Sequence, residues 1–523
     1  MEATINGYKA KFEQLLLNGK FSRLGRNFST TNNKYFYDTG TGKVFRINEN
    51  IDKIVSAFIK TNKFESIYEL GMEEADIKNA LDELFDTVEK QHILQAPPVK
   101  ELFGPQVYDL DKQVLNERSQ LTLEVTEECN MRCKYCIYHE GNGGYREFGN
   151  RMMTFDIAKR ALDRFITDSQ KEELYVSFYG GEPLVNFKLI KECIDYCLKE
   201  YPDKKVRYTM TTNATLMTKE IAEYFAKLPY ANITVSIDGP KELHDKYRVL
   251  RSGEGSFDKT LRGLKYLVEA FGDRAGECVL MNSVLAEVTP ENLEKTQKFF
   301  DELEWLPKEV IHTTAYVDTA DEEVDYQGID GERETKIRER IANNPMNYHP
   351  IGTWGTRKLK DGNGSFDDVE EIAKEEFIKD LLSVHKRFRV DEPSKIYGMN
   401  GCCVPGGRKI YVTVTGDYRI CEKMGPSPTI GNVYDGINVE KIRKEYVTNF
   451  VEEAVKYCKD CWAINLCNVC YTECYDEDGV NFRKRFRRCE SHRVSKEQVL
   501  AEYHEILETN PEKLEFLNTY ELT

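Results

Sequence analysis

The chain has 523 residues, more than the roughly 250 to 300 that one hydrophobic core usually serves, and we expect three domains. It has 73 Lys and Arg residues and 89 Asp and Glu residues, and the resulting formal net charge of −16 argues against a nucleic-acid partner. We expect neither a signal peptide nor a membrane span, because no run of roughly 18 apolar residues is present. We therefore expect a soluble, cytoplasmic protein. Without a secretion signal, its 15 cysteines predict metal binding rather than disulfide bonds.

The first unit, residues 1–95, contains the pattern of a β-hairpin. In KYFYDTGTGKVFRI, residues 34–47, two aromatic and β-branched runs flank Gly40 and Gly42. Asn50 is the predicted cap of the next helix, and another helix is predicted where apolar residues recur over 77–88. A hairpin with small helices outlines a winged helix. Because these helices are acidic, we expect an exposed strand edge to pair with an extended peptide rather than with DNA.

A proline-containing stretch, residues 96–118, is the predicted linker. We expect few contacts between the units on its two sides. Residues 119–390 then alternate strand-like and helix-like runs, which predicts an α/β fold with a parallel sheet. Six strand–helix units are fewer than the eight of a closed TIM barrel, so a partial (β/α)6 barrel and a doubly wound sheet are both allowed. The strands are expected at LTLEVT (121–126), ELYVSFYGG (173–181), VRYTMTTN (206–213), NITVSIDG (232–239), ECVLMNSVL (277–285) and EVIHTTAYV (309–317).

Chemically distinctive residues follow four of these strands. Cys129, Cys133 and Cys136 follow the first without an obvious fourth cysteine, although zinc and four-iron clusters usually take four protein ligands. A zinc site completed by His139 is one alternative. The other strand-end residues are Gly180, Gly181, Glu182, Pro183, Asn213, Ser236 and Asp238. Because parallel strands end at the same side of a sheet, we expect all of them to converge on one mouth.

The spacing CxxxCxxC after the first strand, with GGEP after the second, resembles the radical S-adenosylmethionine (radical SAM) superfamily. The resemblance implies a partial barrel in which Cys129, Cys133 and Cys136 hold a four-iron cluster. SAM would chelate the fourth iron, which accounts for the missing ligand. The resemblance also implies that the GGEP segment meets the methionyl amino group. Tyr135 would stack near adenine, Ser236 and Asp238 would lie near ribose, and Asn213 would belong to the same SAM site.

Nine more cysteines crowd residues 391–500, ahead of a predicted helical tail at 501–523. CKDCWAINLC, residues 458–467, resembles the SPASM-type extension of radical SAM enzymes, which carries two auxiliary four-iron clusters. By that resemblance the outer cluster is held by Cys458, Cys461, Cys467 and Cys489, and the inner one by Cys402 or Cys403, Cys421, and Cys470 or Cys474. Two cysteines, Cys470 and Cys474, stand where the family has one, which leaves this ligand open. Two zinc ribbons are the alternative, and the isolated Cys193, Cys197 and Cys278 are predicted core residues.

A charged, glycine-containing insertion, residues 318–368, follows the last predicted strand. A long excursion inside a compact domain is often functional, although a solvated surface loop explains it equally well. Tyr348, His349 and Trp354 are candidates to line a substrate entrance.

The three parts together resemble maturases of ribosomally made peptides, in particular those that form thioether crosslinks in sactipeptides and ranthipeptides. The resemblance implies an enzyme whose front domain, residues 1–95, binds the leader of a precursor peptide. A 5'-deoxyadenosyl radical would then modify the core peptide. The implied cofactors are SAM and three [4Fe-4S] clusters. The implied partners are the precursor peptide and an electron donor such as flavodoxin or ferredoxin, with no nucleic acid and no membrane. No catalytic acid or base is assigned.

Three other functions share some of these features. A sulfatase-type maturase, which oxidises one residue of a protein, has the same core and extension but does not need the front domain. A radical SAM enzyme that forms carbon–carbon crosslinks in a peptide shares all three parts. A redox-sensing iron–sulfur winged-helix regulator belongs to a different class and would explain the cysteines, but not GGEP or the acidic front domain.

Overall fold

The computed structural model describes residues 2–17, 19–139, 146–317, 323–343, 371–399 and 401–520. Its main element is a ten-stranded sheet in the order β13-β12-β11-β10-β4-β5-β6-β7-β8-β9. Strands β4 to β9 are parallel to one another and lie at Gln120–Thr126, Glu173–Gly180, Lys205–Thr212, Ala231–Ser236, Val279–Leu285 and Ile311–Tyr316. Each of the six predicted strands is present. The α/β class with a large parallel sheet is confirmed, whereas the partial barrel stays a prediction.

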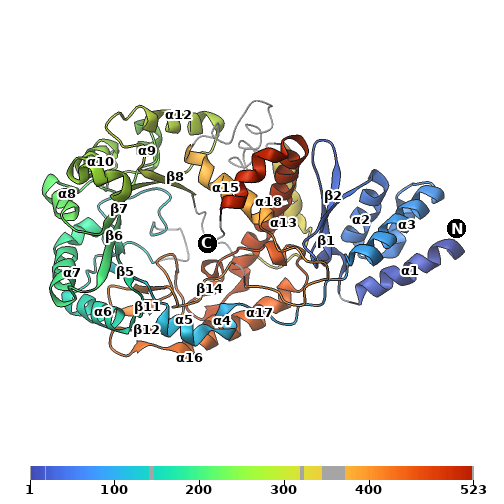
Figure 1. The fold of residues 1–523 in the computed structure, drawn as a ribbon, viewed down its shortest axis with the longest axis horizontal. Coiled ribbons are helices and arrows are strands. Elements are labelled where there is room, and N and C mark those ends of the chain that lie inside the picture. The colour runs from blue at the N-terminus through green and yellow to red at the C-terminus, as the bar shows by residue number, and fades with distance from the viewer. Residues whose placement is uncertain are drawn as a thin grey trace.

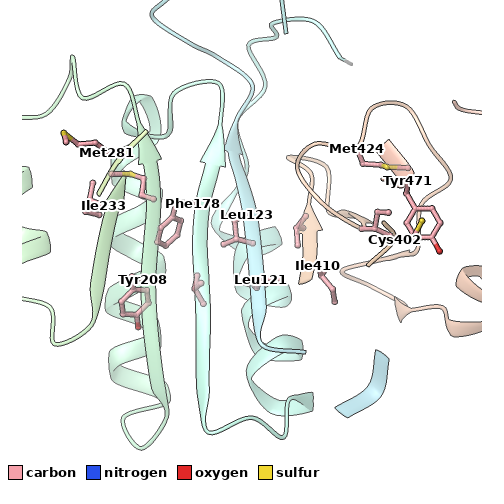
Figure 2. Close-up of a cluster of buried hydrophobic side chains, with 14 of the residues drawn as sticks. Leu121, Leu123, Phe178, Tyr208, Ile233, Met281, Cys402, Ile410, Met424 and Tyr471 are labelled. Carbon is pink, nitrogen blue, oxygen red and sulfur yellow. The ribbon is translucent and has the colours of Figure 1, made fainter. Parts of the chain in front are cut away.

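The main hydrophobic core follows this sheet. Figure 2 shows buried side chains of successive strands side by side, from Ile233 and Phe178 to Leu123 and Ile410, and the same core continues to Cys402 and Tyr471. The predicted core cysteines are confirmed, since Cys193, Cys197 and Cys278 are all buried in it. Cys278, however, ends the short helix α11 (Ala275–Cys278) instead of lying in β8.

Helices follow the parallel strands and lie along the outer side of the curved sheet (Figure 1). Thr154, Thr218 and Thr289 start three of them, each accepting a hydrogen bond from a backbone N–H of the first turn. The helices of this region are α6 (Phe155–Asp168), α7 (Phe187–Glu200), α8 (Lys219–Ala226), α9 (Lys241–Tyr247), α10 (Phe257–Phe271), α12 (Pro290–Asp301), α13 (Glu332–Asn343) and α15 (Glu371–His385). Within the described part of the chain, none of the helices combines the length and apolar character that crossing a membrane requires.

The cysteine-rich region is joined to the same sheet. Strand β10 (Lys409–Val412) pairs in parallel with β4, in the register Ile410 to Leu121 and Val412 to Leu123. The antiparallel strands β11 (Asp417–Arg419), β12 (Gly431–Asn432) and β13 (Gly436–Ile437) extend the sheet from there. The remaining elements are α16 (Val439–Ile442), α17 (Asn449–Cys458), β14 (Tyr475–Asp476), β15 (Gly479–Val480) and the long helix α18 (Phe482–Thr509), which runs through the predicted start of the tail at 501.

The N-terminal part has a core of its own. It contains α1 (Glu2–Leu16), the antiparallel strands β1 (Gly25–Ser29), β2 (Lys34–Asp38) and β3 (Val44–Ile47), then α2 (Glu49–Thr61) and α3 (Glu74–Gln91). The predicted hairpin is therefore formed by β2 and β3. The predicted cap is wrong by two residues: the Asn48 side chain accepts from the N–H groups of Asn50 and Ile51, because the chain already turns helical at residue 49.

Many contacts join residues 1–95 to the linker and to the rest of the chain, against our expectation of an independent front domain. The linker contains the short helices α4 (Pro105–Tyr108) and α5 (Leu110–Asn116). The buried Arg23 donates to the carbonyls of Ala96, Pro97 and Lys459, at 2.8, 2.6 and 2.9 Å. The β2–β3 turn is held by residues 387–394, for example through Val390 N–H to the Thr41 carbonyl. Helix α18 lies beside β1 (Figure 1), where Thr30 donates to Glu508.

Arg23→Met should destabilise the protein by about 3 kcal/mol, because it leaves several buried carbonyl groups without a donor. Urea unfolding followed by tryptophan fluorescence would measure this, since the buried Trp462 lies against Tyr37 of the front domain. The control is Lys20→Met, whose exposed side chain faces Asp460 at 3.8 Å and should change stability by less than about 0.5 kcal/mol. Equal effects of the two substitutions would show that Arg23 does not hold the front domain to the rest of the protein.

Candidate functional site

The ends of β4, β5, β6 and β7 meet, as expected from the parallel order. Asn213, after β6, donates from its side chain to Asn130 in the cysteine loop at 3.0 Å. Glu182, after β5, is buried and accepts from Thr212 Oγ1 at 2.6 Å and from the N–H of Asn213 at 2.8 Å. Tyr135 of the cysteine loop donates to Asp238, after β7. Hydrogen bonds therefore connect Glu182 with Asn213, and connect both Asn213 and Asp238 with the cysteine loop.

Backbone hydrogen bonds hold the loop with three cysteines against residues 247–249. Its backbone donates from Arg132 to the carbonyl of Val249 at 2.8 Å, and from Lys134 to that of Tyr247 at 2.9 Å. Cys129 is buried, and its sulfur accepts from the N–H of Met131 at 3.4 Å. Burial raises the pKa of Cys129 to about 12 and that of Cys133 to about 11, where the nearby Arg248 charge opposes the shift. A bound cation would reverse these shifts by favouring the thiolate forms.

The GGEP glycines allow β5 to end directly against this loop. A side-chain Cβ at Gly181 would lie 2.3 Å from the carbonyl oxygen of Glu128, and Gly180 has a φ of +138°. The N–H groups of Gly181 and Glu182 donate to the carbonyls of Thr126 and Glu128, both at 2.9 Å. The Glu182 carboxylate is taken up by hydrogen bonds within the protein, so its role is to join strand ends. Contact between this segment and an amino group of a ligand stays a prediction.

Asp238 is the centre of a buried polar cluster. It accepts from Tyr135, from Arg248 Nε at 3.0 Å and from the N–H of Val284 at 3.0 Å. His244 accepts from the N–H of Asp238 at 3.3 Å and lies 3.0 Å from the hydroxyl of Ser256. Sequence reasoning missed His244 and Arg248. Their spacing of four residues directly after Ser-Ile-Asp-Gly was the available signal, because it places both on one side of a helical turn.

A pocket with about 370 Å³ of empty space opens beside Asp238, at the ends of β7 and β8. Tyr247, Val284 and Glu287 contribute to its lining. Ser236 is buried at the end of β7, just before this pocket, and pairs with Asn282 of β8. Tyr135 interacts with the protein itself, since its hydroxyl is bonded to Asp238 and its ring centroid lies 5.6 Å from the Arg248 guanidinium.

The four cysteines of the predicted outer cluster line one pocket together. They are Cys458, Cys461, Cys467 and Cys489, around about 590 Å³ of empty space. Aromatic rings of Tyr326, Tyr457 and Phe486 make up much of the remaining wall. Burial raises the pKa of Cys461 to about 12, Arg493 opposes that shift, and Cys467 and Cys489 add to it, which shows that these thiols are neighbours.

The other four cysteines of this region all have Cys470 as a neighbour. Burial raises the pKa values of Cys402 and Cys421, and in both the nearby Cys470 thiol adds to the shift. The same thiol adds to the pKa shifts of Cys403 and Cys474, which burial also raises. Cys402 is buried whereas Cys403 is exposed. Among the described residues, no three His, Cys, Asp or Glu side chains are arranged to hold a single metal ion.

A large charged cavity lies next to two cysteine systems, which are the loop with Cys129, Cys133 and Cys136 and the cysteine-rich region after residue 401. It has about 1000 Å³ of empty space, and its wall includes Tyr138, two residues after Cys136, and Glu422, which follows Cys421. Arg146 pairs with Glu124 at 2.6 Å on the same wall. Sequence reasoning missed this cavity, because its residues come from β4, the cysteine loop and the β10–β11 region. The candidates Tyr348, His349 and Trp354 lie outside the described residues, as does most of segment 318–368.

Comparison with known proteins agrees with this geometry. A family model described as the Radical SAM superfamily matches residues 123–300, from β4 into α12. This region is a radical SAM superfamily domain. It holds the cysteine loop, GGEP, Asn213 and Asp238, so the expected core is confirmed at the level of the superfamily.

Individual relatives resemble the radical SAM domain and the parts around it to different degrees. An uncharacterized protein of Methanocaldococcus jannaschii is 34% identical over 34% of this chain, which spans 56% of that protein. A serine-type anaerobic sulfatase-maturating enzyme of Bacteroides thetaiotaomicron is 25% identical over 65% of this chain and 79% of its own length. A solved structure of polyhistidine-tagged anSMEcpe with bound AdoMet covers 77% of this chain and 96% of its own, with a TM-score of 0.51 and 18% identity, which shows a common fold.

His244 makes stability depend on pH in a defined direction. Burial, with a contribution from Arg248, lowers the pKa of His244 to about 2 from its ordinary value of 6.5, so the native state binds fewer protons than the unfolded state. Its stabilising contribution is therefore complete above the unfolded value and is lost as pH falls below it. Desolvation also lowers the pKa values of His312, His492 and His504, which act in the same direction.

His244→Asn should reduce the loss of stability between pH 7.5 and pH 5.5 by about 1.4 kcal/mol, the linkage contribution of one such histidine. Urea unfolding at both pH values measures the difference. His92→Asn is the matched control, because the His92 side chain is 42% exposed and its left-handed backbone conformation is one that asparagine tolerates. If both variants kept the wild-type acid sensitivity, His244 would not be a buried neutral histidine.

Proposed function

We propose that the protein is a radical SAM maturase that installs thioether crosslinks, from a cysteine sulfur to carbon, in a ribosomally synthesised precursor peptide. The observation that carries this proposal is the cavity between the Cys136–Tyr138 turn and the Cys421–Glu422 segment. It is open, charged and adjacent to both cysteine systems. A peptide held there would have its reacting carbon near one system and its sulfur near the other.

The donor sets fit iron–sulfur clusters. Cys129, Cys133 and Cys136 would hold one [4Fe-4S] cluster, and the pocket beside Asp238 would suit the nucleoside part of SAM. The outer auxiliary cluster would be held by the four cysteines that line the 590 Å³ pocket. For the inner one, burial favours Cys402 over Cys403 and Cys474 over Cys470. When bound, SAM and the cluster at Cys129, Cys133 and Cys136 would supply the radical chemistry for removing a hydrogen atom, which no side chain could perform.

The chain's own residues have three tasks in this reaction. The Glu182 and Asp238 networks fix the strand ends around the SAM site. The cavity wall orients the peptide through charged groups such as Arg151 and Glu422. Joining sulfur to carbon breaks one S–H and one C–H bond, so one hydrogen atom, one proton and one electron leave the peptide. A carboxylate of the wall would take the proton, and the auxiliary cysteine groups are where an electron acceptor would be held.

The front domain is the proposed receptor for the leader peptide. Among the described strands β3 pairs only with β2, which leaves its other edge available for an extended peptide. Phe45 and Ile47 on this strand are half-buried and offer shallow apolar contacts. Holding the leader there would raise the effective concentration of the core peptide at the cavity.

A sulfatase-type maturase is the second candidate function. It is favoured by the similarity to a serine-type sulfatase-maturating enzyme, which extends over 65% of this chain. Such an enzyme oxidises a single residue and leaves an aldehyde, whereas thioether formation consumes a cysteine thiol. The front domain favours the peptide maturase, because the sulfatase-type reaction does not need a leader receptor.

Reconstituted protein should contain about twelve irons if three four-iron clusters are present. Replacing Cys129, Cys133 and Cys136 together by Ala should remove about four of them and abolish reductive cleavage of SAM. The control is Cys193→Ala, a buried core cysteine of α7 that should leave the iron content unchanged. Iron and zinc are measured by elemental analysis. Zinc in place of iron would contradict the proposal and favour the zinc alternatives.

The double variant Phe45→Ala with Ile47→Ala should raise the precursor concentration needed for half-maximal crosslinking at least about tenfold, because leader binding supplies effective concentration. Iron content should stay at the wild-type level. Leu17→Ala is the control, since Leu17 is exposed at the end of α1. The assay is a titration of precursor, scored by mass spectrometry as the loss of two hydrogens and of one alkylatable thiol.

Equal half-saturation for the double variant and the Leu17→Ala control would show that β3 is not the leader receptor. A product that reacts with hydroxylamine, as an aldehyde does, would place the sulfatase-type function first.

A further inference from the structure

Arg485 of α18 lies between the two groups of auxiliary cysteines. Its guanidinium Nη2 is 3.9 Å from the sulfur of Cys467 in the outer group, and Nη1 is 3.9 Å from the sulfur of Cys474 in the inner group. Nη1 also faces the carbonyl of Cys470 at 3.4 Å. The rings of Phe450 and Phe482 lie 5.5 Å from the guanidinium carbon. The side chain is only 4% exposed.

The positive charge of Arg485 has no carboxylate partner among the described residues, and its buried Nε has no hydrogen-bond partner. By contrast, Arg493, two turns further along α18, pairs with the buried Glu334. An arginine stays charged in proteins, and a buried charge is costly without a counter-charge. The groups around Arg485 that can become anionic include several cysteine thiols. Burial raises the pKa of Cys474 to about 12, and the Arg485 charge opposes that shift.

We propose that Arg485 is a positioning residue that bridges the two auxiliary cysteine groups and supplies the positive charge that both require when they hold iron–sulfur clusters. This inference rests on the proposed function. The two arms of the guanidinium fork face one cysteine sulfur of each group, an arrangement that neither a single-point ammonium nor a neutral amide can reproduce. Hydrogen bonds to ligand sulfurs and local positive charge raise the reduction potential of such clusters. Arg485 therefore sets the potentials of both clusters together.

The test is a redox titration of reconstituted holoenzyme, followed by electron paramagnetic resonance, with iron counted in the same samples. Arg485→Gln should move the midpoint potentials of both auxiliary clusters to more negative values, with the cluster at Cys129, Cys133 and Cys136 as internal reference. Arg485→Lys keeps the charge but loses the fork, so it should shift the two potentials unequally. Arg483→Gln is the matched control, because it removes the same charge two residues away on α18, where Arg483 is 56% exposed and faces Glu323.

Loss of about eight irons from Arg485→Gln, with the reference cluster retained, would also support the proposal, since both groups would then depend on this residue. Unchanged potentials with full iron content would overturn it. A shift in one auxiliary cluster alone would overturn the bridging role. If the Gln variant does not accumulate, Arg485→Lys decides: unequal shifts support the bridge, and two unchanged potentials overturn it. Wild-type protein without iron would instead overturn the proposed function.

Discussion

The parallel pairing of β10 with β4 is the constraint on which the rest of the structure depends. It joins residues 409–412 to residues 120–123, the strand that leads into the three-cysteine loop. Cys403 precedes β10, and Cys421 follows the adjacent antiparallel β11, so backbone hydrogen bonds hold both cysteines on the side of the sheet where β4 begins. The large cavity is a direct consequence, because Glu124 of β4 and Tyr411 of β10 form part of the same wall. The radical SAM domain and the cysteine-rich region are therefore one body with a shared core, not two modules on a linker.

The cysteine sites have buried positive charge in common. The protein as a whole carries a formal charge of −16, yet each cysteine system has an arginine beside it in the interior. Arg248 opposes the raised pKa of Cys133, and Arg485 and Arg493 do the same in the auxiliary region. Burial alone would keep these thiols protonated. An arginine next to each group lowers the cost of the thiolate forms that metal binding requires.

The front domain is tied to the auxiliary region more firmly than a tethered receptor would need. Thr39 donates to the carbonyl of Trp462 at 2.8 Å, and the Asn465 side chain donates to the carbonyl of Thr39 at 2.8 Å. Both partners lie in the loop between Cys461 and Cys467. A peptide bound at the hairpin would therefore be held at a defined distance from the outer cysteine pocket. It follows that removing the front domain as a unit would also disturb that pocket, whereas point substitutions on β3 would not.

The sequence by itself determined the features that depend on local spacing. Alternating strand and helix patterns located all six parallel strands, the i, i+4 spacing placed Cys193 and Cys197 in the core, and CxxxCxxC with GGEP identified the radical SAM domain. Local patterns could not show how distant segments compensate one another's charges or hydrogen bonds. Tyr135 and Asp238 are 103 residues apart, and Arg23 holds the carbonyl of Lys459 across 436 residues. Only the tertiary structure revealed Arg248, Arg485 and the charged cavity, because a buried charge acquires its partners from whichever segments the fold brings next to it.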